Sequence, residues 1–180
     1  DELPQTFERF YVGVDYGTNN PTVFLLIGHV GDKLYVIDEY YWDSKKTGRQ
    51  KTDAEYSNDL RQFITGRIPR AIIIDPSAAS FITQLRRDGI GPIKQADNTV
   101  LDGIRNVASF LIGSRLFVYK HKCPNLLKEF SSYVWDAKAQ AKGEDKPVKQ
   151  NDHCLDALRY VVQTLFSRNM VGVVKKPPGW

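Results

Sequence analysis

Three acidic residues, Asp15, Asp75 and Asp156, stand where the surrounding sequence pattern is apolar. Asp15 ends the run "YVGVD", Asp75 ends the run "AIIID", and Asp156 lies beside the apolar stripe of the last predicted helix. Asp near Gly or Pro is also a common turn residue, so either strand-end acid taken alone could simply open a turn. If the two strands are parallel neighbours, however, both carboxylates reach one edge of the sheet, where open α/β sheets keep their sites.

Carboxylates brought together in this way favour binding of a divalent cation. They repel one another, which raises the pKa of at least one of them, and a cation relieves that repulsion. Ligands that offer only oxygen select hard ions such as Mg²⁺ or Mn²⁺. Two such ions about 4 Å apart can activate a water and stabilise the leaving oxygen in phosphodiester cleavage. The pattern therefore predicts a two-metal centre held by Asp15, Asp75 and Asp156.

The helix predicted over residues 151–167 adds two more candidates, Asp152 and His153. Asp152 and Asp156 are spaced i, i+4 and His153 and Asp156 are spaced i, i+3, so all three can face one side. Asp152 could instead cap the helix, and Arg159 could hold Asp156 in an ordinary surface ion pair. His153 could support a metal ligand, shuttle a proton or lie on the surface.

The elements that would position these residues follow an α/β pattern. Residues 10–16, 22–30 and 33–42 are rich in β-branched and aromatic residues and are separated by turn sequences, which predicts a three-strand antiparallel meander. The continuous apolar run 71–74 suits a strand buried on both faces. Helices are predicted from Thr52, where Glu55 completes a capping box, and over the ranges 77–88, 98–112, 123–132 and 151–167. With a further strand over 115–119, this order favours a mixed sheet flanked by helices.

Residues 133–150 are harder to assign. The segment "AKAQAK" has helical propensity, but Gly143 and Pro147 interrupt it, and "YVW" before it and "PV" after it could pair as strands. We expect a β-hairpin here, with Tyr133 and Trp135 in its core. The tail, residues 168–180, has no period and is expected to be a flexible end.

Length and composition limit the classes that this protein can belong to. A chain of 180 residues fits one domain over 1–180, with its core at about 8–167. The net charge of +4 and the pI near 9.0 lean toward a polyanionic partner. Cys123 and Cys154 have no paired spacing, and no apolar run is long enough to cross a membrane. We therefore expect a reduced intracellular protein without a membrane partner. Because the chain starts without a methionine, we also expect it to be a piece of a larger protein.

Three segments together carry a family resemblance: "YVGVDYGTNNPT", "AIIIDPSAASF" and "YVWDAKAQAKGEDKPVKQNDHCLDALRY". They resemble the nuclease domain of the large terminase subunit of tailed bacteriophages, in the ribonuclease H-like superfamily. The last segment is the most specific, because it combines an aromatic-Trp-Asp run, a Lys-Pro-Val return and an Asp-His-x-x-Asp helix in one order. The resemblance spans about residues 8–167.

The resemblance implies a ribonuclease H-like fold and metal-dependent cleavage of double-stranded viral DNA concatemers during genome packaging. It assigns the catalytic acids to Asp15, Asp75 and Asp156, with His153 beside the last. It also places the hairpin near the active site, where Lys138, Lys142, Lys146 and Lys149 could meet DNA phosphates. The implied partners are an N-terminal packaging ATPase, the small terminase subunit and the portal, in the cytoplasm of the host cell. This chain has no GxxxxGK phosphate loop, so we do not expect it to hydrolyse ATP.

Three other functions remain open from the sequence. A junction resolvase or an RNA–DNA hybrid nuclease of the same superfamily would use similar acids. The motif "VGVDYGT" also resembles the first phosphate loop of sugar kinases and actin-like ATPases, although the second phosphate loop of those proteins is absent from this sequence. A DNA-binding module that has lost catalysis is the third alternative, and the presence of all three acids argues against it.

Overall fold

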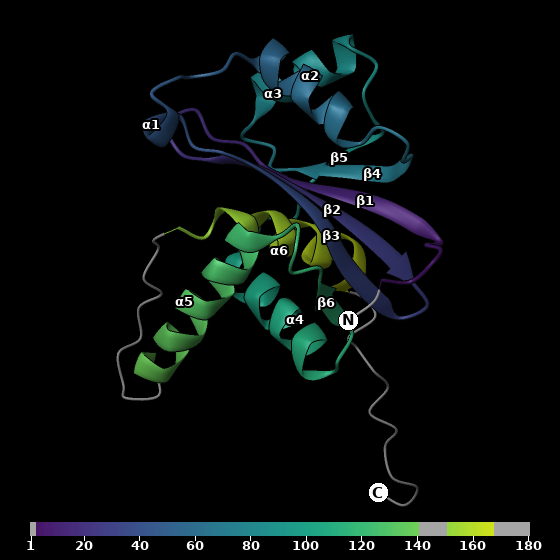
Figure 1. Ribbon diagram of the computed structural model, residues 1–180, viewed down its shortest axis with the longest axis vertical. Helices are drawn as coiled ribbons and strands as arrows, with labels where there is room; N and C mark the ends of the chain where they lie inside the picture. Colours follow the sequence, from purple (N-terminus) through teal and green to yellow (C-terminus); the bar gives the residue numbers. More distant parts are fainter. Residues whose placement is uncertain (1–2, 141–150, 168–180) are drawn as a thin grey trace, which may run out of the picture.

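A mixed sheet of six strands forms the centre of the computed structural model, which describes residues 3–140 and 151–167, with side chains for 3–132 and 151–167. The strand order is β5-β4-β1-β2-β3-β6 (Figure 1). The strands are β1 (Arg9–Asp15), β2 (Thr22–Val30), β3 (Lys33–Trp42), β4 (Pro69–Ile74), β5 (Ile93–Gln95) and β6 (Leu116–Val118).

The pairing of β1 to β4 follows the sequence prediction. Strands β1, β2 and β3 form the antiparallel meander. Strand β4 runs parallel to β1, β5 runs parallel to β4, and β6 runs parallel to β3. Strand β5 was not predicted, because its three residues, Ile-Lys-Gln, are too few and too polar to show a strand period.

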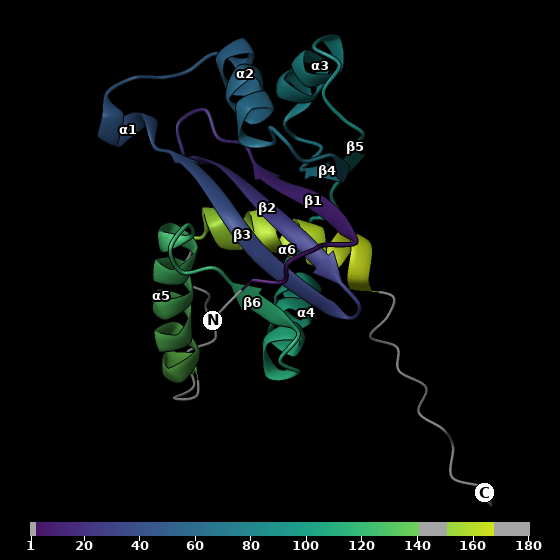
Figure 2. The ribbon, with the colours of Figure 1, turned by 45° about the vertical axis from the view of Figure 1, so that its right-hand side comes forward.

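Helices cover both faces of the sheet (Figures 1 and 2). They are α1 (Ser44–Thr47), α2 (Asp53–Phe63), α3 (Ala79–Arg87), α4 (Val100–Ile112), α5 (Pro124–Gln140) and α6 (His153–Phe166). Helices α2 and α3 lie over one face, and α4, α5 and α6 lie on the other. Strand side chains alternate between these layers: Val12 and Val14 pack with the α2 and α3 layer, whereas Tyr11 packs with the α6 layer. Asp15, an even number of residues after Tyr11, therefore belongs to the α6 side.

The predicted β-hairpin is wrong for residues 133–140. Helix α5 does not stop near Ser132 but continues to Gln140, through "YVWDAKAQ". The Ala, Lys and Gln residues favour a helix, and a helix already under way needs no new nucleus, which outweighs the strand preference of Tyr, Val and Trp. The second half of that prediction, residues 141–150, and the predicted flexible tail lie outside the described residues.

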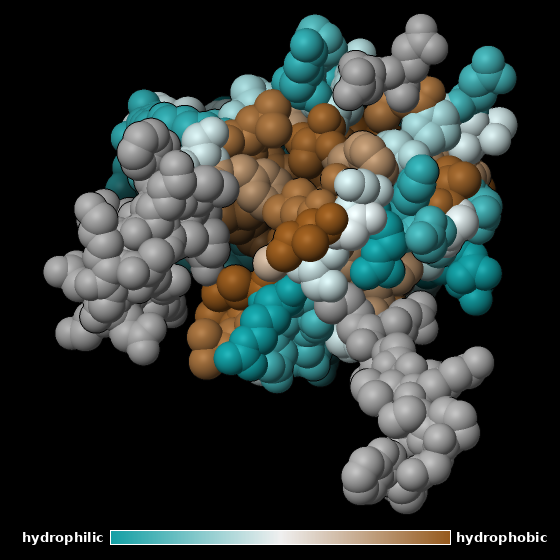
Figure 3. All heavy atoms as spheres, turned by 90° about the horizontal axis from the view of Figure 1, so that it is seen from below, coloured by the Kyte–Doolittle hydropathy of each residue, from teal (hydrophilic) through white to brown (hydrophobic). Residues whose placement is uncertain are grey.

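One side of the layer that contains α4 carries exposed apolar side chains. Figure 3 views the molecule from below, and brown side chains gather there in a hollow. The exposed large apolar residues of α4 and β6 are Val100, Leu101, Leu111, Ile112 and Phe117. The described part of the chain thus leaves part of this layer uncovered, as interaction surfaces often are.

Within the described ranges, none of the helices combines the length and the apolar character that a membrane crossing requires.

Candidate active site

Asp15 and Asp75 lie side by side at the carboxyl ends of two parallel strands. In the pairing of β1 with β4, Val14 is opposite Ile74, and each aspartate is the next residue of its chain. Their charges are close enough that Asp75 raises the pKa of Asp15. The predicted neighbourhood of the two strand ends is confirmed.

Helix α6 packs against β1 at Gly13. A Cβ atom on Gly13 would lie 2.3 Å from the carbonyl oxygen of Ala157, so only glycine allows the helix this close to the strand. The close approach puts the first turn of α6 beside Asp15, where Nδ1 of His153 lies 2.9 Å from Oδ2 of Asp15. His153 is therefore part of the acid cluster and not an isolated surface histidine.

The Asp15 and His153 side chains shift each other's protonation. Burial raises the pKa of Asp15, the hydrogen bond with His153 opposes that shift, and the charges of Asp152 and Asp75 add to it. The same hydrogen bond to Asp15 raises the pKa of His153, and burial opposes it. The pair therefore holds a proton more tightly than an isolated histidine would.

Asp156 is held by a buried arginine. Arg159 donates from Nη2 to Oδ1 of Asp156 at 2.8 Å, and its Nη1 donates to the carbonyl oxygens of Asn98 and Thr99 at 2.9 and 3.2 Å. The Arg159 side chain is only 7% exposed. Burial raises the pKa of Asp156, and Arg159 opposes that shift. The alternative of an ordinary surface ion pair is wrong, because the loop before α4 covers the guanidinium.

Asp75 is fixed by neutral donors. It accepts the backbone N–H of Ser77 at 2.8 Å and Nδ2 of Asn98 at 3.0 Å. Partial burial raises the pKa of Asp75, but the hydrogen bonds from Ser77, Asn98 and Tyr160 outweigh it and leave the pKa below its ordinary value. Asp75 is thus ionised more readily than Asp15 and Asp156, whose pKa values are raised.

The first turn of α6 is capped by a residue from another helix. Asp152 occupies the N-cap position, but its side chain makes no capping hydrogen bond, which removes the support for reading it as a cap. Instead, Oε2 of Glu129 on α5 accepts the backbone N–H of Leu155 at 2.9 Å. Glu129 is buried, and burial raises its pKa to about 7 against the opposing hydrogen bonds from the backbone. The charge of Asp152 instead raises the pKa values of Asp15 and Asp156.

Three residues of the site were missed by the sequence analysis: Tyr160, Asn98 and Glu129. Tyr160 is one helical turn after Asp156, so the i, i+4 spacing was a usable signal. Its pKa is raised by burial and further by the charges of Asp15, Asp156 and Asp75, so it lies near all three acids. Glu129 interrupts the apolar spacing of α5 between Leu126 and Phe130, which was a weaker signal. Nothing local marked Asn98.

The predicted DNA-binding lysines are not brought to the site by anything described. Lys138 lies on α5, where the side chain is not described, and Lys142, Lys146 and Lys149 lie outside the described residues. Their predicted role stays a prediction.

The donor set suits a hard divalent cation, because three or four carboxylates converge from two strand ends and one helix. As the side chains lie, no group of three or more His, Cys, Asp or Glu residues within 3–132 and 151–167 is placed to hold one ion. Instead, His153 contacts Oδ2 of Asp15, and Arg159 donates to Oδ1 of Asp156. Metal binding by these residues would therefore require their side chains to shift from the positions that they hold here.

Comparisons with known proteins agree with this architecture. The family model of the terminase RNase H-like domain matches residues 12–165. No curated protein sequence matches the chain. The large terminase of a thermophilic bacteriophage is 49% identical with a TM-score of 0.81, over 91% of this chain and 41% of that one. This chain therefore spans less than half the length of that relative.

Two more distant structures share the fold. The large terminase nuclease domain of bacteriophage P22 is 20% identical with a TM-score of 0.65, over 91% of this chain and 84% of that one. The corresponding domain of bacteriophage SPP1 is 23% identical with a TM-score of 0.61, over 91% and 88%. At these identities the likeness supports the mixed sheet with flanking helices, and the matched residues 12–165 include Asp15, Asp75 and Asp156. The chain belongs to the terminase RNase H-like domain family.

Proposed function

We propose that this domain is a metal-dependent endonuclease that cleaves double-stranded viral DNA during genome packaging. The observation that carries the proposal is the convergence of Asp15, Asp75 and Asp156 from two strand ends and one helix. Family membership supports the reaction class, since the matched family is the RNase H-like domain of terminases. The domain would act in the cytoplasm of the infected host cell.

Two divalent cations, Mg²⁺ or Mn²⁺, would be held by Asp15, Asp75 and Asp156, with Asp152 as a further ligand. When bound, such ions supply water activation and stabilisation of the leaving oxygen. The SPP1 nuclease domain was solved with bound Mn, which supports the choice of metal by likeness of fold. The oxygen-only donor set of this chain supports it independently.

The chain's own residues would set the geometry and the charge of the site. Asn98 and the Ser77 backbone fix the direction of the Asp75 carboxylate. Arg159 restrains Asp156 and, being permanently charged, opposes the rise in its pKa that burial causes. His153 shares a proton with Asp15 through Nδ1. When Asp15 binds a cation, His153 would either keep that proton or release it to solvent.

The substrate and partners are part of the proposal. Duplex DNA is the substrate, and cleavage needs no covalent enzyme intermediate. The large terminase of the thermophilic bacteriophage was solved in complex with ATP-gamma-S, and this chain matches 41% of it. We infer that a packaging ATPase on the same polypeptide, the small subunit and the portal add DNA affinity and restrain cleavage in the full assembly.

The test is cleavage of supercoiled plasmid with Mn²⁺, Mg²⁺ or EDTA. We expect nicking and linearisation with either metal, none with EDTA, and a loss of at least about 100-fold in Asp15→Asn, Asp75→Asn and Asp156→Asn, because ligands matter at least as much as the residues that orient them. Faster cleavage of a four-way junction or an RNA–DNA hybrid than of linear duplex would reassign the substrate. Cleavage that persists in EDTA would refute the metal-dependent mechanism.

A further inference from the structure

A basic segment, residues 43–51 with the sequence DSKKTGRQK, follows β3 at the same sheet edge as the acids. The sheet register shows this, because Asp15 is opposite Val23 and Val23 is opposite Tyr41. Two strand spacings separate Asp15 from Tyr41, which is about 10 Å, and the basic segment begins two residues later. In both ribbon views α1, within this segment, lies at the end of the sheet where α6 begins (Figures 1 and 2).

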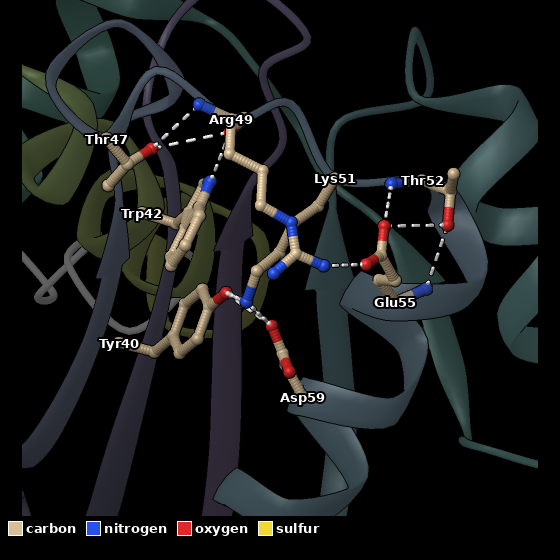
Figure 4. Close-up of polar contacts among 8 residues, drawn as sticks. All are labelled: Tyr40, Trp42, Thr47, Arg49, Lys51, Thr52, Glu55 and Asp59. Carbon is tan, nitrogen blue, oxygen red and sulfur yellow. Dashed lines mark hydrogen bonds and ion pairs between the residues drawn. The ribbon is translucent and has the colours of Figure 1, made fainter.

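Hydrogen bonds hold the backbone of the basic segment in place (Figure 4). Asp43 Oδ1 accepts the backbone N–H groups of Lys45 and Lys46 at 3.0 and 3.3 Å. The chain turns back at Gly48, whose φ of 65° favours glycine. Nε1 of Trp42 then donates to the carbonyl oxygen of Arg49 at 3.1 Å. A solvent-exposed loop with no buried residue of its own in α1 is thus fixed by its polar groups.

Two of the four cations of the basic segment serve this framework. Lys51 points inward, 2.5 Å from Oδ2 of Asp59 and 3.8 Å from the centre of the Trp42 ring. Arg49 pairs with Glu55, which also closes the capping box of α2 with Thr52 (Figure 4). These two charges are largely neutralised where they lie.

The other two cations, Lys45 and Lys46, point to solvent. Both are exposed, and among the described residues neither has a carboxylate within ion-pair distance. The basic segment is also joined to the β1–β2 turn, because Nε2 of Gln50 donates to the Thr18 carbonyl oxygen at 3.4 Å. That turn, residues 16–21, contains no acidic residue. The turn thus adds no carboxylate between the basic segment and Asp15, and the carboxylate of the segment itself, Asp43, is engaged by the backbone N–H groups of Lys45 and Lys46.

We propose that the basic segment is a phosphate-contacting surface that guides the DNA backbone to the acid cluster. The inference rests on the proposed function, since it assumes that duplex DNA is the substrate. Without metal, a cluster of carboxylates repels a polyanion, and cations on a fixed support beside it offset that repulsion and bring phosphates close. Lysines without paired carboxylates bind phosphate as point charges and read no sequence. Contact should accordingly be electrostatic and the same for all DNA sequences.

The experiment compares Lys45→Gln/Lys46→Gln with Arg86→Gln/Arg87→Gln. The control pair is also exposed, adjacent and in the last turn of a helix, α3. Helix α3 starts after the carboxyl end of β4 and leads to the parallel strand β5, so it returns to the opposite sheet edge. Both variants lose two charges, and only one of them loses them beside the acids.

For the lysine variant we expect duplex binding in EDTA, measured by fluorescence anisotropy, to weaken at least about tenfold at low salt. The slope of log affinity against log salt should fall by about 1 for each lysine. KM for DNA cleavage should rise, Mn²⁺ affinity should not change, and Lys45→Arg/Lys46→Arg should restore binding. The arginine control should change each quantity much less.

The outcomes separate this inference from the proposed function. If the wild type cleaves DNA and the lysine variant matches the arginine control in affinity and salt slope, the phosphate-contacting surface is refuted and the nuclease stands. If the wild type neither binds nor cleaves duplex DNA with any metal, the proposed function fails, and this inference fails with it.

Discussion

The two helical layers bury different kinds of side chain. The layer of α2 and α3 packs on the sheet through apolar groups such as Phe24, Ile72 and Phe81, and its buried polar residue is Ser57. The layer of α5 and α6 buries Glu129, Arg159 and Gln163. Burying a charge is costly unless it is paired and hydrogen-bonded. We infer that the first layer stabilises the sheet and that the second also fixes the position of charged groups.

Their helix caps show the same contrast. Helix α2 carries its own capping box, in which Thr52 and Glu55 satisfy each other's backbone groups at the surface. Helix α5 is capped by Glu39 of β3, which accepts the backbone N–H groups of Asn125 and Leu126 at 2.7 and 3.0 Å. Helix α6 is capped in turn by Glu129 of α5. The helix that bears His153 and Asp156 is thus positioned by distant parts of the chain, whereas α2 is specified locally.

Arg159→Met should produce the largest loss of stability. Methionine keeps the packing of the side-chain stem but leaves Asp156 without its cation, which costs about 3 kcal/mol for a buried pair. The control is Arg105→Met, which removes another i, i+3 pair, with Asp102, that is exposed and 3.6 Å apart. Such pairs contribute about 0.5 kcal/mol. Equal losses for the two variants in urea unfolding would contradict the contrast between the layers.

Gly13→Ala should destabilise the α6 layer by about 2 kcal/mol, the usual size of an overpacking effect. The new methyl would meet backbone, not a flexible side chain, so α6 must move away from β1. The control is Ala54→Gly on the exposed face of α2, which also exchanges glycine and alanine but touches neither α6 nor β1. Gly66→Ala is not used, because the positive φ of Gly66 disfavours alanine. We expect Gly13→Ala alone to weaken Mn²⁺ binding, measured by calorimetry. Unchanged Mn²⁺ affinity in Gly13→Ala would show that the packing of α6 on β1 does not determine metal binding.

Glu129→Gln should change how stability depends on pH. The folded pKa of about 7 is above the unfolded value near 4.5, so the folded state holds a proton that the unfolded state has released. Stability should therefore fall as pH rises from about 4.5 to about 7, by no more than about 1.4 kcal/mol per pH unit. Glutamine keeps an oxygen for the Leu155 N–H and should flatten that slope.

The control for that experiment is Glu55→Gln. Hydrogen bonds, above all from the Thr52 backbone N–H, lower the pKa of Glu55. Its contribution to stability is therefore lost only as pH falls below the ordinary pKa of a glutamate. Its removal should leave the slope between pH 5 and pH 8 as it is in the wild type. An unchanged slope in Glu129→Gln would show that Glu129 is ionised throughout this range.

Lys51→Met should have the smallest effect, about 1 kcal/mol. It removes an ion pair whose side chains are 12% and 19% exposed and a cation–π contact with Trp42 while keeping the stem. The loss is small because Asp59 is not left without a donor: it retains the hydroxyl of Tyr40 at 2.6 Å. Thermal unfolding would measure it. A loss as large as that of Arg159→Met would mean that the α2 layer also depends on buried charge.

The sequence predicted the structure correctly where the residue pattern of a short segment is enough to define the element. The continuous apolar run before Asp75 predicted a strand buried on both faces, and its parallel pairing with β1, which the structure shows, was the condition for bringing Asp15 and Asp75 together. The capping box of α2 was also predicted, because all its atoms come from four consecutive residues. Fold class and the meeting of Asp15 with Asp75 could both be reached in this way.

What the sequence could not supply were contacts made across long stretches of chain. The alternative of a surface ion pair between Arg159 and Asp156 stayed open, because the burial of Arg159 depends on the loop at Asn98. Glu129 was overlooked because its partner lies 26 residues away on another helix. The end of α5 was misassigned because "YVW" favours a strand in isolation, whereas a helix already formed favours continuing.

The central claim is that Asp15, Asp75 and Asp156 form one metal centre. The most direct measurement is calorimetric titration of Mn²⁺ into the wild type, Asp15→Asn, Asp75→Asn and Asp156→Asn, with Asp32→Asn in an exposed turn as the control. We expect binding by the wild type and the control, and at least about tenfold weaker binding by each of the other variants. Because burial raises the pKa of Asp15, removing its charge should not unfold the domain. Binding that is equal in all five proteins, or absent at millimolar Mn²⁺, would contradict the account.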